Sequence, residues 1–405
     1  MSTTSAAIRG GDDMSDHREA VRSNAKYLRN VRPIDPDEIS EYIDGTPHPA
    51  VVKQLLREEA ADLGLLEQAD GTFVPVDDGP VRPRRGPVEA FPADYERRLE
   101  DLLADRYGPN WYDGPSGDLL RSTIRRFKAD YLDGRSVEYD DDVAAGYAIY
   151  HLPGYYAAVQ YALDDLADRG LLDRQLRVLD VGAGVGGPAL GLCDYLPDDA
   201  LVDYHAIEPS AAADVLETLL AETGRNVHTT IHRTTAEAFD PSDAATDGFD
   251  PTAPGDGFDL VLACNVLSEL DDPATVARSF LETVAPDGTF LAMAPADKNT
   301  SVGLREIERE LEGQRVWDRD AVAPADGDEA AGADHRRGEV TVYGPTVRLW
   351  PGETPSDRGW SFDVQPDLAV PGFQRRLDER ERALGDGRGA ALLAERPRHL
   401  AVVLG

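Results

Sequence analysis

Cysteine and long apolar runs are both scarce in this chain of 405 residues. With only two cysteines, Cys193 and Cys264, a disulfide framework and a four-cysteine metal or cluster site are both excluded. No apolar run approaches the ~18 residues that a membrane-spanning helix needs, and the N-terminus lacks the apolar segment of a secretory signal. We therefore expect a soluble, cytoplasmic protein with no membrane partner and no bound metal.

Basic residues are also scarce: the chain has 41 Lys and Arg residues against 76 Asp and Glu residues, which gives a net charge of −35. An excess of this sign normally opposes binding to nucleic acid. The carboxylates are spread along the whole chain, however, as in proteins adapted to high salt, where screening weakens their mutual repulsion. The composition therefore predicts a halophilic acidic protein and leaves an RNA partner possible.

The first half of the chain predicts mainly helices. Residues 49–66 have helical spacing of apolar side chains, and a hairpin is expected around Asp70-Gly71. This order fits a winged helix-turn-helix, but it fits equally a helical hairpin packed on the next domain. We divide this half into a disordered tail (1–20), a small helical or winged-helix-like module (21–79), a Pro- and Arg-rich linker (80–89) and a helical region (90–174).

From residue 175 onward, strand-like apolar runs alternate with helix-like segments. This alternation predicts an α/β fold whose parallel strands are joined by right-handed crossovers into a doubly wound sheet. We place this domain at 175–405. Two insertions rich in Gly, Ala and Asp, at 240–257 and 323–339, are expected to be mobile acidic loops.

A glycine-rich turn follows the first strand of this domain in the segment Val178-Leu-Asp-Val-Gly-Ala-Gly-Val-Gly-Gly187. Glycines there allow a ligand to approach the backbone, and the next helix presents free N–H groups. The glycines fit both the dinucleotide fingerprint and a methyltransferase turn, so they do not decide between the two. Asp180 favours the second, because a carboxylate can hold an ammonium group but repels a pyrophosphate.

The pattern Asp-x-Gly-x-Gly-x-Gly, together with the Ala285-Pro-Asp-Gly288 turn before the strand TFLAMAP, resembles class I S-adenosylmethionine-dependent methyltransferases over about residues 176–296. The resemblance implies a seven-stranded sheet and S-adenosylmethionine as the cofactor. Asp180 would hold the methionine ammonium, directly or through water, and Glu208 would accept from the ribose hydroxyls. The alternatives are that Asp180 only caps the turn and that Glu208 only starts a helix. The predicted cofactor-binding residues are Asp180, Gly182, Ala183, Gly184, Gly186, Glu208, Cys264 and Asn265.

Two short segments, NVLSEL and His151-Leu-Pro-Gly-Tyr-Tyr-Ala-Ala158, resemble the methyltransferase-like family associated with the small ribosomal subunit. This resemblance covers roughly residues 140–320 and implies that subunit, or its rRNA, as the partner. The iron–sulfur cysteines of that family are missing here, so no cluster is expected. The predicted RNA contacts are the linker arginines Arg82, Arg84 and Arg85, the helix with Arg121, Arg125, Arg126 and Lys128, and the segment Arg348–Trp360. Such charges are more often a solvated surface.

We therefore predict a methyltransferase or methyltransferase-like factor that acts on the small ribosomal subunit in translation. One alternative is a non-catalytic assembly factor that binds S-adenosylmethionine, and another is a small-molecule or protein methyltransferase unrelated to ribosomes. A dinucleotide-dependent oxidoreductase fits less well. The sequence identifies no general base, so the catalytic residues stay open, as do the methyl acceptor and the oligomeric state.

Overall fold

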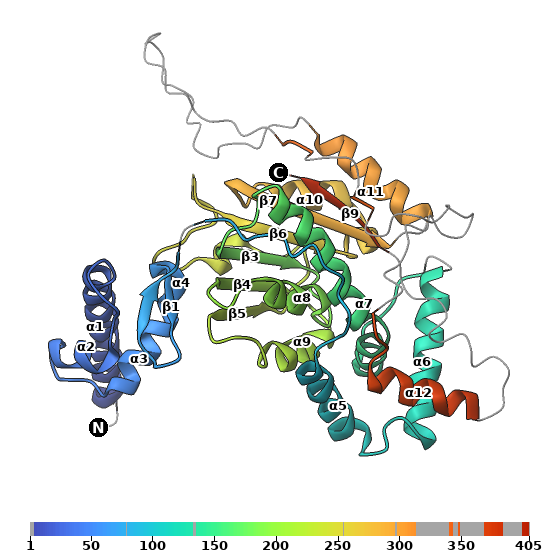
Figure 1. Ribbon diagram of the computed structural model, residues 1–405, viewed down its shortest axis with the longest axis horizontal. Helices are drawn as coiled ribbons and strands as arrows, with labels where there is room; N and C mark the ends of the chain where they lie inside the picture. Colours follow the sequence, from blue (N-terminus) through green and yellow to red (C-terminus); the bar gives the residue numbers. More distant parts are fainter. Residues whose placement is uncertain are drawn as a thin grey trace, which may run out of the picture.

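The computed structural model describes residues 4–77, 79–132, 135–253, 255–295, 298–312, 340–342, 347–348, 368–383 and 399–404 (Figure 1). The acidic insertion predicted at 323–339 and the tryptophans of the segment 348–360 lie outside the described residues.

The N-terminal residues form a module of four helices and a hairpin. The two strands of the hairpin pair antiparallel, and Ile34 forms a bridge with Phe73 that adds a third extended segment. The elements are α1 (Thr4–Leu28), α2 (Pro36–Tyr42), α3 (Pro49–Glu58), α4 (Ala60–Leu63), β1 (Leu65–Glu67) and β2 (Phe73–Pro75).

The sequence predicts a disordered tail over residues 1–20, whereas in the structure helix α1 begins at Thr4. The reason lies in its second half, where Val21, Ala25 and Leu28 are buried in the core of the module. Side chains anchored in a core hold a helix that its polar composition alone would not stabilise.

The helix predicted over 49–66 ends earlier, at Leu63. Gly64 adopts a left-handed backbone conformation, with φ of 59°, and its N–H closes the last turn of α4. A glycine in this conformation is a common helix terminator, because it carries no Cβ to clash there. Leu65 and Leu66 then become the first strand of the hairpin.

Three long helices precede the sheet: α5 (Ala93–Tyr107), α6 (Gly114–Leu132) and α7 (Asp141–Asp168). The linker before them is fixed on α7, since the backbone N–H groups of Arg84 and Arg85 both donate to Asp164. Helix α12 (Gly372–Ala383), which the sequence does not predict, packs against α5 and α7 and buries Phe373 completely.

Five parallel strands form the centre of the second domain in the order β5-β4-β3-β6-β7. The predicted α/β fold with a parallel sheet is thereby confirmed. These strands are β3 (Gln175–Val181), β4 (Leu201–Ile207), β5 (Val227–His232), β6 (Phe258–Cys264) and β7 (Val284–Pro295). Strand β9 (His399–Leu404) pairs antiparallel with β7, and the two-residue β8 (Val347–Arg348) pairs with β9.

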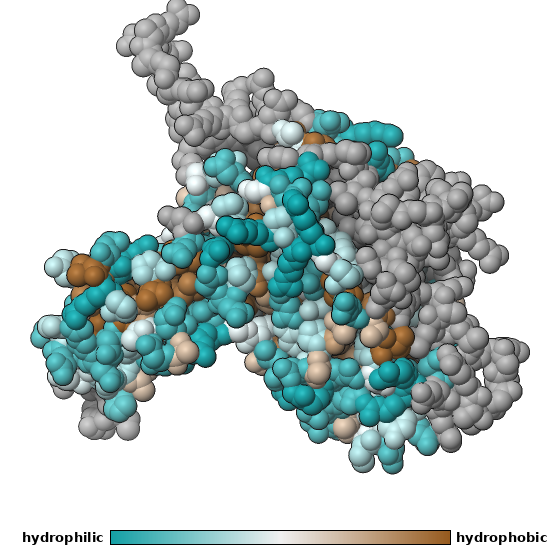
Figure 2. Space-filling model, in the orientation of Figure 1, coloured by the Kyte–Doolittle hydropathy of each residue, from teal (hydrophilic) through white to brown (hydrophobic). Residues whose placement is uncertain are grey.

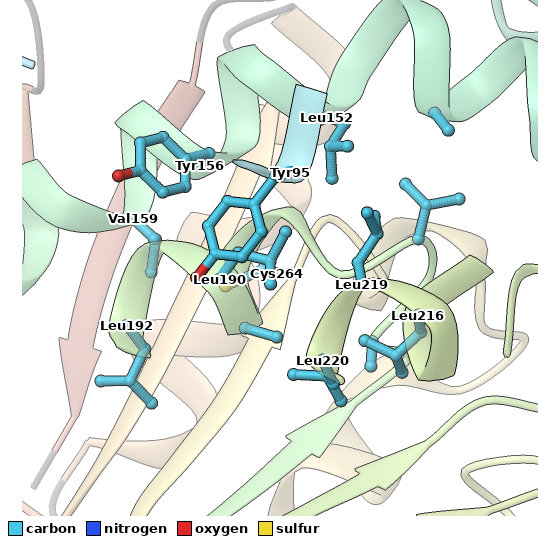
Figure 3. Packing of buried hydrophobic residues seen from close by; sticks show 14 of the residues in the cluster. Tyr95, Leu152, Tyr156, Val159, Leu190, Leu192, Leu216, Leu219, Leu220 and Cys264 are labelled. Carbon is cyan, nitrogen blue, oxygen red and sulfur yellow. The ribbon is translucent and has the colours of Figure 1, made fainter. Parts of the chain in front are cut away.

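Helices cover both faces of this sheet. On one face, α7 packs on α8 (Gly187–Tyr195) and α9 (Ala212–Leu220), whose apolar side chains meet above Cys264 (Figure 3). On the other face lie α10 (Pro273–Leu281) and α11 (Lys298–Leu311), with the short helices η1 (Pro241–Ala244) and η2 (Leu267–Glu269) nearby. The carboxyl ends of β3, β4 and β6 remain open between the two layers.

The N-terminal module contacts the other end of the sheet, where the parallel strands begin (Figure 1). Gln175 donates to the carbonyl of Ala61 (3.2 Å), and Arg177 forms a 2.8 Å ion pair with Asp62. Leu201 is buried in the core of the module. The module is therefore joined to the domain away from the carboxyl ends of the strands.

The acidic insertion at 240–257 packs against this junction, in contrast to the mobile loop that the sequence predicts. Thr246 donates to Asp62 (2.8 Å), and the ring of Phe249 is buried under the guanidinium of Arg177 at 4.2 Å. A buried aromatic side chain fixes the loop despite its acidic composition. Elsewhere, the described surface is largely hydrophilic on the face shown in Figure 2, as the charge predicts.

Candidate active site

A cavity of about 240 Å³ opens at the carboxyl ends of β3, β4 and β6. In open α/β sheets this is the edge at which ligands bind. Asp180 and Gly186 do not belong to its lining. The predicted residues that do are Gly182, Ala183, Gly184, Glu208, Cys264 and Asn265.

The glycine turn is shaped by backbone conformations that other residues rarely adopt. Gly182, Gly184 and Gly186 have φ of 67°, 56° and 91°. A Cβ on Gly182 would lie 2.5 Å from Val266, and a Cβ on Gly186 would lie 2.7 Å from Leu216. The turn therefore requires glycine both for its conformation and for space.

Glu208 ties the end of β4 to this turn. Its Oε2 accepts from the N–H of Gly184 at 2.9 Å, and its Oε1 accepts from the backbone N–H of Ser210 at 2.9 Å and from the Ser210 hydroxyl. A carboxylate has about four acceptor positions. Glu208 therefore orders the turn and can still accept a hydrogen bond from a ligand in the cavity.

Asp180 lies behind the turn and is fully buried. Tyr204 donates its hydroxyl to Oδ2, whereas Oδ1 has no hydrogen-bond partner in the described part of the chain. Burial raises the pKa of Asp180 to about 7; the bond from Tyr204 opposes this rise and the charge of Glu208 adds to it. A buried carboxylate oxygen without a donor fits a cationic group of a ligand.

The end of β6 contributes Cys264 and Asn265. Burial, reinforced by the charge of Asp180, raises the pKa of the Cys264 thiol well above its ordinary value, so the group stays neutral and is no nucleophile. Asn265 has a left-handed φ of 66°, and its N–H donates to the carbonyl of Met293 at 2.9 Å. Asn tolerates this conformation better than most residues.

Three further lining residues, absent from the predicted site, are Tyr139, Tyr147 and Tyr155, which we call the tyrosine wall. The hydroxyls of Tyr147 and Tyr155 lie 3.1 Å apart, and the ring of His151 stacks on Tyr155 at 4.9 Å. Burial raises the pKa of all three tyrosines, so they are neutral phenols. The four-residue spacing from Tyr147 through His151 to Tyr155 places them on one face of α7, and this spacing is the sequence signal that could have revealed them.

Glu269, in η2, lines the cavity beside this wall. Tyr139 donates its hydroxyl to Oε1 at 3.2 Å. The residue as a whole is exposed, although protein atoms pack around its carboxylate and partly desolvate it. This enclosure raises the pKa of Glu269 to about 7; the bond from Tyr139 opposes the rise and the charge of Glu208 adds to it. An acid that titrates near neutrality can take and release a proton at physiological pH.

All the charged side chains in the described lining are acidic, namely Glu208, Glu237 and Glu269. No lysine, arginine or histidine belongs to that lining. Within the described ranges, no group of three His, Cys, Asp or Glu side chains is placed to hold a metal ion. The cavity is therefore electrostatically suited to cationic or neutral ligands and unsuited to anions.

Three of the predicted RNA-contacting arginines, Arg84, Arg85 and Arg121, bond to other groups of the protein. Arg121 is only 2% exposed and forms a 2.7 Å ion pair with Asp118. Arg84 donates to the carbonyl of Asp194, and Arg85 pairs with Asp168. Arg125 and Arg126 of the same helix as Arg121 are exposed. RNA contact therefore stays a prediction, supported by fewer arginines than the sequence indicates.

Comparison with known families gives two matches in separate parts of the chain. A family profile described as "Methyltransferase domain" matches residues 179–290, which include the glycine turn, Glu208 and the end of β6. A second, described as "Domain of unknown function (DUF8157) N-terminal domain", matches residues 18–69 of the N-terminal module. No curated protein matches the sequence significantly.

Several solved structures are similar to this chain. The [4+2]-cyclase SpnF is 14% identical, with a TM-score of 0.35, over 70% of this chain and 92% of that one. The mitomycin 7-O-methyltransferase MmcR is 16% identical, with a TM-score of 0.29, over 75% and 83%. The plantazolicin methyltransferase BpumL, solved with S-adenosylhomocysteine (SAH), is 12% identical, with a TM-score of 0.32, over 77% and 99%.

No helix among the described residues is long and apolar enough to cross a membrane. The methyltransferase profile covers the glycine turn, Asp180, Glu208 and the carboxyl ends of β3, β4 and β6. The turn, Glu208 and these strand ends line one side of the cavity. The chain is an S-adenosylmethionine-dependent methyltransferase, and S-adenosylmethionine is its cofactor.

Proposed function

We propose that this enzyme methylates a small-molecule acceptor that binds in the cavity against the tyrosine wall. The observation that carries the proposal is the lining itself, which holds three tyrosines, three carboxylates and, among the described residues, no cation. A polyanion such as RNA would be repelled there, because its phosphates need positive partners. A small neutral or cationic molecule meets no such penalty.

The cofactor side of the proposal rests on three features. The glycine turn allows close approach to the backbone, Glu208 can still accept from a ribose hydroxyl, and Oδ1 of Asp180 is a buried acceptor for the methionine ammonium, directly or through water. The sheet order β5-β4-β3-β6-β7-β9-β8, with helices on both faces, supports the doubly wound, seven-stranded class I arrangement. Bound S-adenosylmethionine supplies an electrophilic methyl group on its sulfonium.

The small ribosomal subunit is the competing acceptor, and its support is the resemblance of two short segments. Of the residues predicted to contact RNA, Arg121 is buried and Arg84 and Arg85 bond to the protein itself. We therefore rank the small-molecule acceptor first.

The test has two steps, both in molar KCl because of the acidic composition. Calorimetry should show SAH binding that Asp180→Ala and Glu208→Ala each weaken, and no binding of NAD. Radiolabelled S-adenosylmethionine is then incubated with the enzyme and either a small-molecule extract or purified small subunits. Label in the small-molecule fraction supports the proposal. Label in rRNA alone contradicts the proposed acceptor, and tight NAD binding contradicts the cofactor.

A further inference from the structure

The side chains around Glu269 suggest which chemical class of acceptor the cavity takes. We propose that the acceptor is an amine, that it enters as an ammonium ion between Glu269 and the tyrosine wall, and that Glu269 takes its proton before methyl transfer. This inference rests on the proposed function and names the substrate class of the same cavity.

The geometry leaves one oxygen of Glu269 available. Tyr139 holds Oε1, and Oε2 has no hydrogen-bond partner among the residues that the structure describes. Tyr139 thus fixes the carboxylate through one oxygen, and Glu269 lines the cavity. A carboxylate held in this way can accept a charge-assisted hydrogen bond from an ammonium N–H.

The surroundings favour a cation over an anion. Tyrosine rings attract ammonium groups through their negatively polarised faces, and rings combined with a carboxylate strengthen this attraction. The titratable groups that share the cavity with Glu269 are the acids Glu208 and Glu237, the neutral thiol of Cys264 and the neutral tyrosine wall. The charge of Glu208 raises the pKa of Glu269, as two carboxylates do when no cation lies between them. An ammonium ion would relieve that repulsion.

A hydroxyl acceptor fits less well. A phenol attacks most readily as its phenolate, and forming that anion beside Glu208 and Glu269 would add a like charge to an acidic cavity. An amine adds no negative charge, since it enters the cavity as an ammonium ion and is neutral when it attacks. The charge set of the cavity therefore distinguishes nitrogen from oxygen acceptors.

An ammonium N–H passes its proton to Oε2 of Glu269, which becomes a carboxylic acid, and the nitrogen gains a lone pair. The amine then forms a C–N bond as the C–S bond breaks, with the C–S electron pair remaining on sulfur as a thioether. The product leaves as an N-methylammonium ion, and Glu269 releases its proton to solvent through the cavity.

Binding of three matched probes tests this without requiring turnover. Benzylammonium, benzyl alcohol and benzoate share a ring and differ in charge, and each is titrated by NMR into the protein saturated with SAH in molar KCl. Direct ion contacts survive at this salt concentration, where the screening length is about 3 Å. We expect benzylammonium to bind, benzyl alcohol to bind more weakly and benzoate not to bind.

Two variants locate the effect. Glu269→Gln should weaken benzylammonium binding by roughly tenfold or more, as the loss of a charged hydrogen-bond acceptor implies, and should leave SAH affinity unchanged. Asp271→Asn removes an exposed carboxylate two residues away and should change neither affinity.

The outcomes separate the two proposals. Failure of SAH to bind overturns the proposed function, and the inference fails with it. If SAH binds, the inference alone is overturned by any of three results: no benzylammonium binding, equal or tighter binding of benzyl alcohol or benzoate, or an unchanged affinity in Glu269→Gln.

Discussion

The glycine turn and the tyrosine wall line the same cavity but are built by different physical means. The turn depends on the backbone: Gly182 has a left-handed φ, and a Cβ there would lie 2.5 Å from Val266. The wall depends on side-chain ends, such as the hydroxyls of Tyr147 and Tyr155, which are carried by one long helix. Damage to the turn should therefore abolish cofactor binding, whereas single changes at the wall should be tolerated.

The two regions meet where α7 crosses α8. A Cβ on Gly187 would lie 2.6 Å from Cβ of Tyr155, and a Cβ on Gly191 would lie 2.3 Å from Val159. These two glycines let the helix of the wall pack directly on the helix that follows the turn. The position of the wall is consequently set by the same element that closes the cofactor side.

The largest effect should come from Gly182→Ala. The added methyl group meets Val266 and forces an alanine into a left-handed conformation, so we expect SAH affinity to fall by roughly a hundredfold or more. Isothermal calorimetry measures it. Gly170→Ala is the matched control, because Gly170 has a similar φ of 73° but no atom within 4 Å of its Cβ position. Equal losses of SAH affinity in the two variants would mean that backbone strain, and not the contact with Val266, causes the loss.

A second prediction concerns Asp180→Asn. The buried carboxyl has its pKa raised to about 7, whereas an unfolded aspartate ionises near 3.9, so the folded state holds the proton more tightly. Its contribution to stability is therefore present below the unfolded pKa and is lost as the pH rises through about 7. The asparagine carries no such charge and can still accept from Tyr204.

We accordingly expect Asp180→Asn to raise the Tm of the cofactor-free protein relative to wild type, with a difference that grows between about pH 5 and pH 8, while SAH affinity falls. Thermal unfolding at both pH values checks the first part, and calorimetry checks the second. The pKa shift limits the stability gain to on the order of 4 kcal/mol. A Tm difference that is independent of pH would show that Asp180 is ionised in the folded protein throughout this range.

The smallest effect should come from Tyr139→Phe, which removes only the hydroxyl that donates to Glu269. That hydrogen bond lowers the pKa of Glu269, so its loss should move the acidic limb of the methyl-transfer pH profile upward by a fraction of a unit. The profile is measured with the amine acceptor once it is found. An acidic limb that moves downward, or stays in place, would mean that Glu269 does not set it.

The two regions also differ in how far the sequence reveals them. The glycine turn lies within ten consecutive residues, and Glu208 follows at the end of the next strand. The local sequence pattern is therefore enough to predict the cofactor side of the cavity. The tyrosine wall combines Tyr139, which precedes α7, with residues inside that helix, and Glu269 comes from a short 3-10 helix after β6. The four-residue spacing places Tyr147 and Tyr155 on one face of α7, but only the packing of α7 against the sheet brings that face to Tyr139 and Glu269.

Two other segments also differ from their sequence predictions, the loop at 240–257 and the helix that carries Arg121. The loop at 240–257 looks mobile by composition, but the burial of Phe249 under Arg177 orders it through a contact between distant segments. Arg121 looks like part of a basic surface, yet it is buried and paired with Asp118. Phe249 is held by a contact with a distant segment, and the guanidinium of buried Arg121 lies 3.5 Å from the carbonyl oxygen of Leu377 in α12.

The most direct test of the account compares the two carboxylates that face the cavity, Glu208 and Glu269, by calorimetric titration of SAH in molar KCl. We predict that Glu208→Ala weakens SAH binding by roughly tenfold or more, because it removes the acceptor beside the glycine turn. Glu269→Gln should bind SAH as wild type does. If the two variants lose SAH affinity to the same extent, or if only Glu269→Gln loses it, the division of the cavity into a cofactor side and an acceptor side is wrong.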